Sequence, residues 1–205
     1  MAPSNVKLVY FNGRGRAEQI RWILVQGGAK WEDKRIEFAD WPSVKSSTPI
    51  GSLPYLESDG QSVATSGAVA LYAAREYGLI GCNNLEAALI HMIWECTQDA
   101  FNASVKAAFC EDKEKQAEMF KEYFSVSLPK LLKLLAGRLS GGKDWLVGKK
   151  VSMADLVTVS LLEQYKDGPG LEAIKAHKGV YELVQRVTAL PNIQKWIANR
   201  PQTDL

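Results

Sequence analysis

The chain has few of the residues that build metal sites or disulfide frameworks. Its 205 residues include three cysteines and two histidines, His91 and His177. The cysteines Cys82, Cys96 and Cys110 are 14 residues apart and form no Cys-x-x-Cys pair, whereas a zinc site needs about four clustered ligands. A disulfide framework needs a higher density of cysteine. We therefore expect no structural metal, no disulfide scaffold and a reducing, cytoplasmic environment.

An excess of one charge and a long apolar run are also missing. Lysine and arginine together number 25 and acidic residues 23, for a net charge of +2, which is too balanced for a nucleic-acid-binding surface. No apolar run approaches the roughly 20 residues that span a membrane, and residues 1–5 have no signal-peptide character. Hydrophobic residues make up 46% of the chain, enough to form a core. We expect a folded protein that binds neither nucleic acid nor membrane.

The first 80 residues have the pattern of a mixed α/β unit. Strands are expected over 6–11 and 31–37, with a helix over 16–25 between them. Because the connection is helical, the two strands should be parallel. Asp59-Gly60 between two short apolar runs predicts a hairpin, and a helix should follow over 66–77. The predicted order is βαβ followed by ββα.

The remaining sequence predicts only helices. A long helix carries an apolar stripe within 85–109, which indicates core packing, with a dimer interface as the alternative. A second helix is expected over 113–136 with a kink at Pro129, then a buried helix over 153–165, and two short helices near 181–189 and 193–198. These patterns place one domain at 1–80 and an all-helical one at 84–205.

Two local motifs indicate more specific roles. Tyr10 ends the first predicted strand, just before a helix whose first turn contains Arg16. A helix start and an arginine favour an anion, to which a phenol can donate a hydrogen bond, although a strand tyrosine more often only packs. Ser152 and Asp155 fit a capping box, which predicts a structural role for Asp155.

The glycines after the first strand begin like a dinucleotide-binding fingerprint. The sixth position of that pattern is Glu18, where a small residue would let helix and strand pack closely. A glycine-rich turn into a helix is therefore the better interpretation.

Four stretches, in this order, resemble the sigma class of cytosolic glutathione transferases: residues 10–18, 39–42 and 51–56, and the Ser152–Asp155 capping box. The resemblance covers nearly the whole chain, including its last six residues. It implies an α/β thioredoxin-like N-terminal domain that binds glutathione and an all-α C-terminal helical bundle with a hydrophobic substrate pocket. The implied activity is conjugation of the glutathione thiolate to hydrophobic electrophiles by a homodimer, with detoxification as its role.

The resemblance also implies roles for individual residues. Tyr10 matches the tyrosine that stabilises the thiolate, and Arg16 matches an arginine that helps to hold it. The positions that match glutathione-binding residues are Tyr10, Trp41, Lys45, Ser52, Leu53, Pro54 (after a cis bond), Thr65, Ser66 and Asp99, the last reaching the partner subunit's site. The positions implied for the substrate pocket are Phe11, Gly13, Arg14, Asn102, Ala107, Val157, Leu161 and Leu205.

Several departures from the family pattern leave alternatives open. Thr65 stands where the family usually has glutamine, which affects the γ-glutamyl contact. One relative, a glutathione-dependent prostaglandin D synthase, binds metal through acids that match Cys96 and Ala100 here, so we expect no metal. Its pocket tryptophan matches Ala107, which weakens a prostaglandin-type isomerase as the alternative function. A crystallin-like structural protein or a ligand carrier is the other alternative, although residues 109–116 lack the insertion often found in lens crystallins.

Overall fold

The computed structural model describes residue 3 and residues 5–203, and it divides into two compact units. The first unit consists of Met1–Ile80 and Leu190–Leu205, and the second of Gly81–Ala189. The sequence groups residues 84–205 into one helical domain, but α10 (Pro191–Asn199) packs on α1 (Gly15–Gln26) of the first unit. The division into domains at 1–80 and 84–205 stays a prediction.

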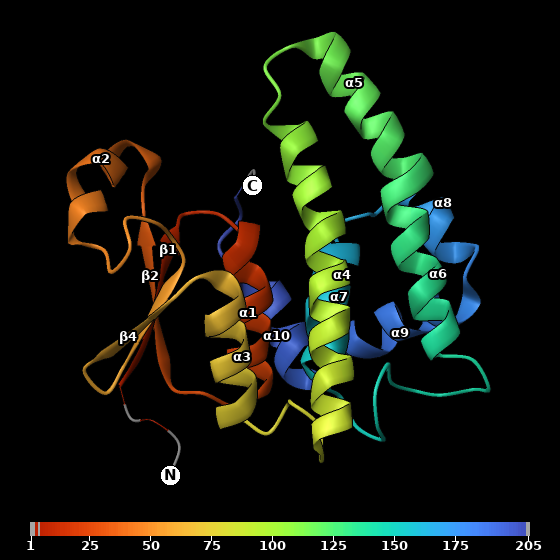
Figure 1. The fold of residues 1–205 in the computed structure, drawn as a ribbon, viewed down its shortest axis with the longest axis horizontal. Coiled ribbons are helices and arrows are strands. Elements are labelled where there is room, and N and C mark those ends of the chain that lie inside the picture. The colour runs from red at the N-terminus through yellow and green to blue at the C-terminus, as the bar shows by residue number, and fades with distance from the viewer. Residues whose placement is uncertain (1–2, 4, 204–205) are drawn as a thin grey trace. The chain divides into compact units, whose positions relative to one another are not determined.

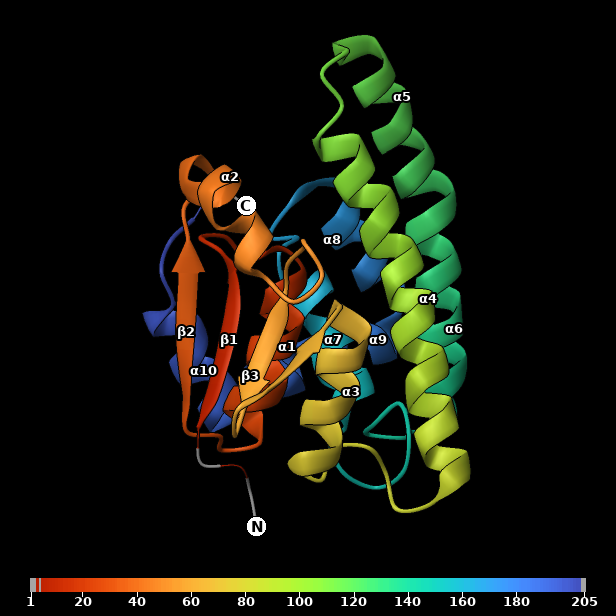
Figure 2. The same ribbon diagram turned by 60° about the vertical axis from the view of Figure 1, so that its left-hand side comes forward.

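A four-stranded mixed sheet forms the centre of the first unit, in the order β2-β1-β3-β4 (Figure 2). As predicted, β1 (Val6–Phe11) and β2 (Trp31–Ile36) are parallel. In their register, Tyr10 lies opposite Arg35. The antiparallel hairpin β3 (Tyr55–Ser58) and β4 (Gln61–Ala64) is also confirmed. Its loop residues Asp59 and Gly60 have φ values of 45° and 82°, the two positive values that a type I′ turn requires.

Helices α1 and α3 (Ser66–Glu76) pack together on one face of this sheet (Figure 1). The short segments η1 (Phe38–Asp40), α2 (Trp41–Val44) and η2 (Lys45–Ser47) lie beyond the end of β2 (Figure 2). The core of the first unit includes these fully buried apolar side chains: Leu8, Ile20, Trp22, Ile23, Leu24, Leu56, Val69, Ala70 and Ala73. The βαβ-ββα order of a thioredoxin-like domain is confirmed.

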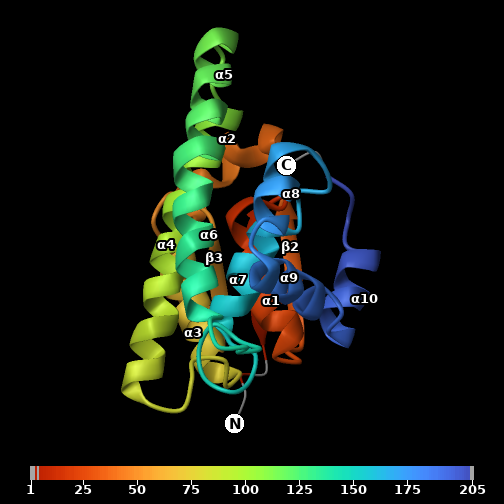
Figure 3. The same ribbon diagram turned by 90° about the vertical axis from the view of Figure 1, so that its right-hand side faces the viewer.

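In the second unit, α4 (Asn84–Ala108) runs antiparallel to a long helical rod (Figures 1 and 3). The rod consists of α5 (Lys113–Glu122), the π-helical turn η3 (Tyr123–Ser127) and α6 (Leu128–Arg138). The π-helical turn ends directly before Leu128-Pro129. Proline lacks an N–H and clashes with the preceding turn of a regular helix. The π-helical turn is therefore the irregularity that the sequence predicts as a kink at Pro129.

Helix α7 (Met153–Leu162) is the buried helix that the sequence predicts, and it packs against α4 and against α9 (Lys178–Thr188). The expected pair of short helices corresponds to α9 and α10, but the sequence reading missed α8 (Gly168–Lys175) between them. Two glycines in the first turn of α8 lower helix propensity. A proline in that turn is a favourable start signal, and it could have identified the helix.

The apolar stripe predicted on α4 is buried only in part. Leu85 and Met92 are 69% and 39% exposed, whereas Ile93 of the same stripe is fully buried. The buried side of the helix also contains Trp94 and Thr97, and Thr97 Oγ1 lies 3.0 Å from Thr158 Oγ1 of α7. The stripe therefore contributes to the core along one edge, and periodicity alone could not show which edge is exposed. The alternative, a dimer interface, stays a prediction.

Candidate active site

The hydroxyl of Tyr10 lies at the start of α1. Tyr10 is the penultimate residue of β1, and the backbone N–H of Arg16 donates a hydrogen bond of 3.3 Å to its hydroxyl oxygen. Gly15 makes this approach possible, because it has a φ of +39° and a Cβ there would lie 2.7 Å from that oxygen. The Tyr10 hydroxyl therefore lies next to the partial positive charge at the start of α1.

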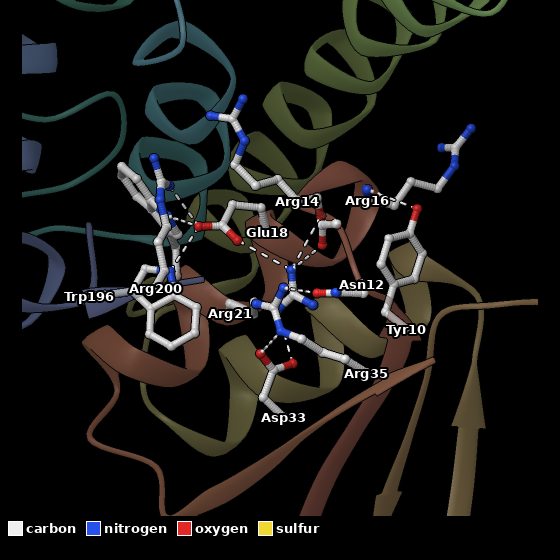
Figure 4. Close-up of polar contacts among 12 residues, drawn as sticks. Tyr10, Asn12, Arg14, Arg16, Glu18, Arg21, Asp33, Arg35, Trp196 and Arg200 are labelled. Carbon is white, nitrogen blue, oxygen red and sulfur yellow. Dashed lines mark hydrogen bonds and ion pairs between the residues drawn. The ribbon is translucent and has the colours of Figure 1, made fainter. Parts of the chain in front are cut away.

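Arg16 contacts Tyr10 through its backbone rather than its guanidinium. In Figure 4 the Arg16 side chain extends away from the tyrosine hydroxyl, and Arg14 extends in another direction from the same turn. Gly13 and Arg14, both predicted for the substrate pocket, form this turn between β1 and α1. The structure thus brings four predicted residues together, and their roles toward a ligand stay predictions.

An aromatic cluster connects Tyr10 to Trp41, one of the predicted glutathione-binding residues. The ring of Phe11 lies 5.5 Å from that of Tyr10 and 5.3 Å from that of Trp41, both edge-on, and it stacks on Phe38 at 4.6 Å. Such contacts fix ring orientations in addition to burying area. Lys45, which begins η2 four residues after Trp41, is exposed. Trp41 is therefore held relative to Tyr10, with Lys45 on the solvent side.

The segments before β3 and α3 complete the predicted glutathione-binding set in the first unit. The Leu53–Pro54 peptide bond is cis, as predicted, and Ser52 before it is exposed. Thr65 precedes α3 with a φ of +72°, a conformation that costs a β-branched residue about 1–3 kcal/mol. In the described part of the chain, the Thr65 side chain does not cap α3, which begins at Ser66.

The predicted residues of the second unit lie on α4 and α7. Asp99 and Asn102 are exposed on α4, whereas Ala107 is buried on the same helix. Val157 and Leu161 are buried on α7. Leu205 lies outside the described residues, so its predicted place in the pocket has no structural description. A shared pocket formed by these residues stays a prediction.

The capping box at the start of α7 is confirmed. The Ser152 N–H donates to Asp155 Oδ2 at 2.8 Å, and the Leu146 N–H donates to Asp155 Oδ1 at 2.9 Å. Burial raises the pKa of Asp155 to about 6, and these hydrogen bonds oppose that rise. Both carboxylate oxygens are engaged in holding protein backbone, which supports the structural role that the motif predicts.

Sequence reasoning missed a buried polar network behind the Tyr10 turn (Figure 4). Glu18 is 4% exposed and Arg21 is fully buried, although both are charged residues on one face of α1. Glu18 accepts hydrogen bonds from Trp22 of α1 and from Trp196 and Arg200 near the C-terminus. The spacing of Glu18, Arg21 and Trp22 at i, i+3 and i+4 is the signal that could have revealed a polar cluster on that face.

The described residues contain neither a metal-binding cluster nor a membrane-spanning helix. Residues 3 and 5–203 contain no group of three or more histidine, cysteine or acidic side chains placed to hold a metal ion. Among the described helices, none combines the length and apolar character needed to cross a membrane.

Comparisons with known proteins agree with this geometry. Residues 6–75 match the family model "Glutathione S-transferase, N-terminal domain", and residues 98–200 match "Glutathione S-transferase, C-terminal domain". The chain belongs to the glutathione S-transferase family. This family uses glutathione as a substrate.

Individual relatives cover almost the whole of this glutathione transferase. It is 37% identical to glutathione S-transferase 1 of Ascaris suum over 203 residues, which cover 96% of this chain and 97% of the relative. It is 40% identical to hematopoietic prostaglandin D synthase of Gallus gallus, over 97% and 98% of the two chains. The structure of the monomeric glutathione S-transferase Na-GST-3 of Necator americanus superposes with a TM-score of 0.89 at 31% identity, covering 98% of this chain and all of the other.

Proposed function

We propose that this glutathione transferase activates the thiol of glutathione with Tyr10 and joins it to small hydrophobic electrophiles. The observation that carries the proposal is the Tyr10 hydroxyl at the start of α1, where it accepts the Arg16 N–H and can donate its own proton. A phenol polarised in this way is a suitable donor to a thiolate.

The physical task is to lower the pKa of a thiol. A free cysteine thiol has a pKa of about 8.5 and is mostly protonated at neutral pH, whereas the thiolate is the nucleophile. A reduction by about 2 units requires roughly 3 kcal/mol of stabilisation of the anion. A hydrogen bond from Tyr10, the α1 dipole and the charge of Arg16 can supply an energy of that size.

The reaction then needs no group beyond the thiolate and the electrophile. The thiol proton leaves to solvent, and the sulfur lone pair forms a bond to the electrophilic carbon. With an aryl halide, the carbon–halogen bond breaks and halide leaves with the bonding electrons. The hydrogen bond from Tyr10 holds the sulfur in position before attack.

The first unit has suitable groups for each end of the tripeptide. The Trp41 indole N–H and the Lys45 ammonium are donors for the glycine carboxylate. The Leu53 backbone, next to Ser52, would pair with the central cysteine. The first N–H groups of α3, at Ser66, suit the γ-glutamyl carboxylate, because a helix start binds anions.

The assembly that we propose is a sigma-class homodimer in the cytoplasm, with detoxification as its role. The exposed edge of the apolar stripe of α4 is a suitable interface, and Asp99 on the same helix would reach the γ-glutamyl ammonium in the partner subunit. A monomer remains the competing state, because a structural relative from Necator americanus is described as monomeric.

The hydrophobic electrophile would contact Phe11, Gly13 and Arg14 near Tyr10. A prostaglandin-type isomerase is the second candidate function, because the prostaglandin D synthase of Gallus gallus is 40% identical. The resemblance matches Ala107 to the pocket tryptophan of a prostaglandin D synthase, and the small side chain here favours conjugation over this isomerisation.

The test is a comparison of two assays on the same purified protein. Conjugation of glutathione to a chromogenic aryl halide should be readily measured and should depend on Tyr10. Glutathione-dependent isomerisation of a prostaglandin endoperoxide should be much slower. A protein that binds glutathione but catalyses neither reaction would support a carrier or a crystallin-like role instead.

A further inference from the structure

Arg21 is a fully buried guanidinium whose hydrogen bonds converge on the turn between β1 and α1. Its Nη1 donates to the carbonyl oxygen of Gly13 at 2.7 Å and to that of Arg14 at 3.4 Å. Its Nε donates to Asp33 Oδ1 of β2 at 3.1 Å. Arg21 therefore ties two consecutive carbonyls of the turn to the neighbouring strand (Figure 4).

Those two carbonyls belong to the two residues directly before α1. Gly15 follows them with a φ of +39°, and the next N–H, from Arg16, donates to the Tyr10 hydroxyl. That bond is long, at 3.3 Å, and hydrogen bonds weaken steeply as distance and angle depart from their optimum. A small rotation of the turn would separate the N–H from the phenol.

A second connection from β2 supports the same turn. Asp33 Oδ2 accepts from Arg35 at 2.8 Å, and Arg35 in turn donates to Asn12 Oδ1 at 3.3 Å. Asn12 is the residue directly before Gly13. The carboxylate of Asp33 thus holds two arginines that reach the turn from different sides.

Glu18 anchors Arg21 from the opposite side. Its Oε2 lies 3.3 Å from Arg21 Nη1, while its Oε1 accepts from Trp196 and Arg200, each at 2.8 Å. Burial would raise the pKa of Glu18, but the Arg21 charge and the hydrogen bonds from Trp196 and Arg200 outweigh it and lower the pKa. Glu18 is therefore a buried anion, and it fixes the Arg21 guanidinium in one orientation.

We propose that Arg21, held by Glu18, is a positioning residue that sets the turn from which the Arg16 N–H polarises Tyr10. This inference rests on the proposed function, because it assigns Tyr10 the thiolate-stabilising role. Arg21 is not a catalytic residue, since its hydrogen bonds go to the turn, to Asp33 and to Glu18. Arg21 keeps the Arg16 N–H within hydrogen-bonding distance of the Tyr10 hydroxyl.

The test compares three substitutions in the first unit with one control. Arg21→Met removes every donor at similar length, and Arg21→Lys keeps one cation that can still reach the Gly13 carbonyl. Glu18→Gln keeps an acceptor for Trp196 and Arg200 but removes the charge that orients Arg21. Asp155→Ala disrupts a buried carboxylate of the second unit and is the control for general destabilisation.

The main readout is the pKa of the bound glutathione thiol, measured from thiolate absorbance and from the pH profile of kcat/KM. Arg21→Met should raise this pKa by about 0.5–1 unit, the value of one ordinary hydrogen bond, with little change in the KM for glutathione. Glu18→Gln should raise it by less, and Arg21→Lys should restore most of the wild-type value. Asp155→Ala should lower stability and leave the thiol pKa unchanged.

A second readout is independent of activity. In protein labelled with ¹³C-tyrosine, the Tyr10 signal, assigned through Tyr10→Phe, should shift in Arg21→Met and in Glu18→Gln but not in Asp155→Ala. Wild-type thiol and Tyr10 signals in folded Arg21→Met would overturn the inference. If Arg21→Met does not fold, wild-type signals in Glu18→Gln would overturn it equally. A different outcome separates the two proposals. If the Tyr10 signal shifts in the variants but the wild-type protein does not conjugate glutathione, the positioning role is supported and the proposed function is refuted.

Discussion

The starts of α3 and α7 show two different uses of a helix N-terminus. At α7, Ser152 and Asp155 form a capping box, and Asp155 also holds the Leu146 N–H. At α3, Thr65 has a φ of +72° and does not cap the helix among the described contacts. The α7 start is satisfied by its own side chains and supports the fold. The α3 start retains conformational strain and donors that suit an anion.

The start of α1 is intermediate between these two. Its second residue, Arg16, donates its N–H to a phenol that has a proton of its own to donate. In the proposed function, Tyr10 directs the dipole of α1 to the thiolate of glutathione. The comparison teaches that the starts of α1 and α3 are suited to the proposed binding and catalysis, whereas the start of α7 serves stability.

The largest effect should come from Tyr10→Phe. If Tyr10 donates to the thiolate, its loss removes a charged hydrogen bond of about 1.5–3 kcal/mol, and turnover should fall roughly 10- to 100-fold. Glutathione affinity should change little, because the tripeptide's contacts remain. Steady-state kinetics with an aryl halide checks this, and unaltered turnover where chemistry limits the rate would remove Tyr10 from its assigned role.

Asp99→Asn should weaken glutathione binding by about 1–3 kcal/mol, the cost of losing a charged partner, if Asp99 completes the partner subunit's site. Turnover at saturating glutathione should fall less than affinity does. Calorimetry measures the affinity and sedimentation the assembly state. An active monomer, or unchanged affinity in the variant, would contradict the shared site and place all binding in the first unit.

Asp155→Ala should destabilise the protein by at least about 1 kcal/mol, because it leaves the buried N–H groups of Leu146 and Ser152 without their acceptor. Denaturant unfolding measures this loss. The folded variant should conjugate glutathione at nearly the wild-type rate. A stable but inactive variant would mean that the α7 start also belongs to the site.

The smallest effects are pH slopes of opposite sign from two buried carboxylates. The raised pKa of Asp155, about 6, gives stability that is present at acid pH and is lost as the pH rises through 6. The lowered pKa of Glu18 gives stability that is present at neutral pH and is lost as the pH falls through that lowered pKa. Each slope is at most about 1.4 kcal/mol per pH unit.

Unfolding measured across pH for wild type, Asp155→Asn and Glu18→Gln separates these two contributions. The stability of wild type relative to Asp155→Asn should decrease between about pH 4 and 7. Its stability relative to Glu18→Gln should decrease on acidification below about pH 4. Slopes of the same sign in both comparisons would mean that the two carboxylates have similar environments.

Short motifs predicted the fold well where their residues strongly favour one local structure. Asp59-Gly60 gave the hairpin, Pro129 gave the interruption of the long helix, and Ser152 with Asp155 gave the capping box. Each depends on neighbours within a few residues. Such features can be predicted without knowing what packs against them.

Apart from α8, whose signals are local, the misses depend on long-range packing. Leu85 and Met92 of the α4 stripe are exposed because the neighbouring side of the helix, which includes Trp94 and Thr97, is the buried one. Glu18 is buried because Trp196 and Arg200, about 180 residues later, supply its donors. The site was predictable in part, since the residues near Tyr10 follow from the family resemblance, but the network that holds them appears only in three dimensions.

The most direct test of the account is the pKa of the glutathione thiol bound to wild type, to Tyr10→Phe and to Asp155→Ala. The account predicts a wild-type value roughly 2 units below that of a free thiol, a clear rise toward the free value in Tyr10→Phe, and no change in Asp155→Ala. A wild-type value equal to that of free glutathione, or one that Tyr10→Phe leaves unchanged, would contradict it.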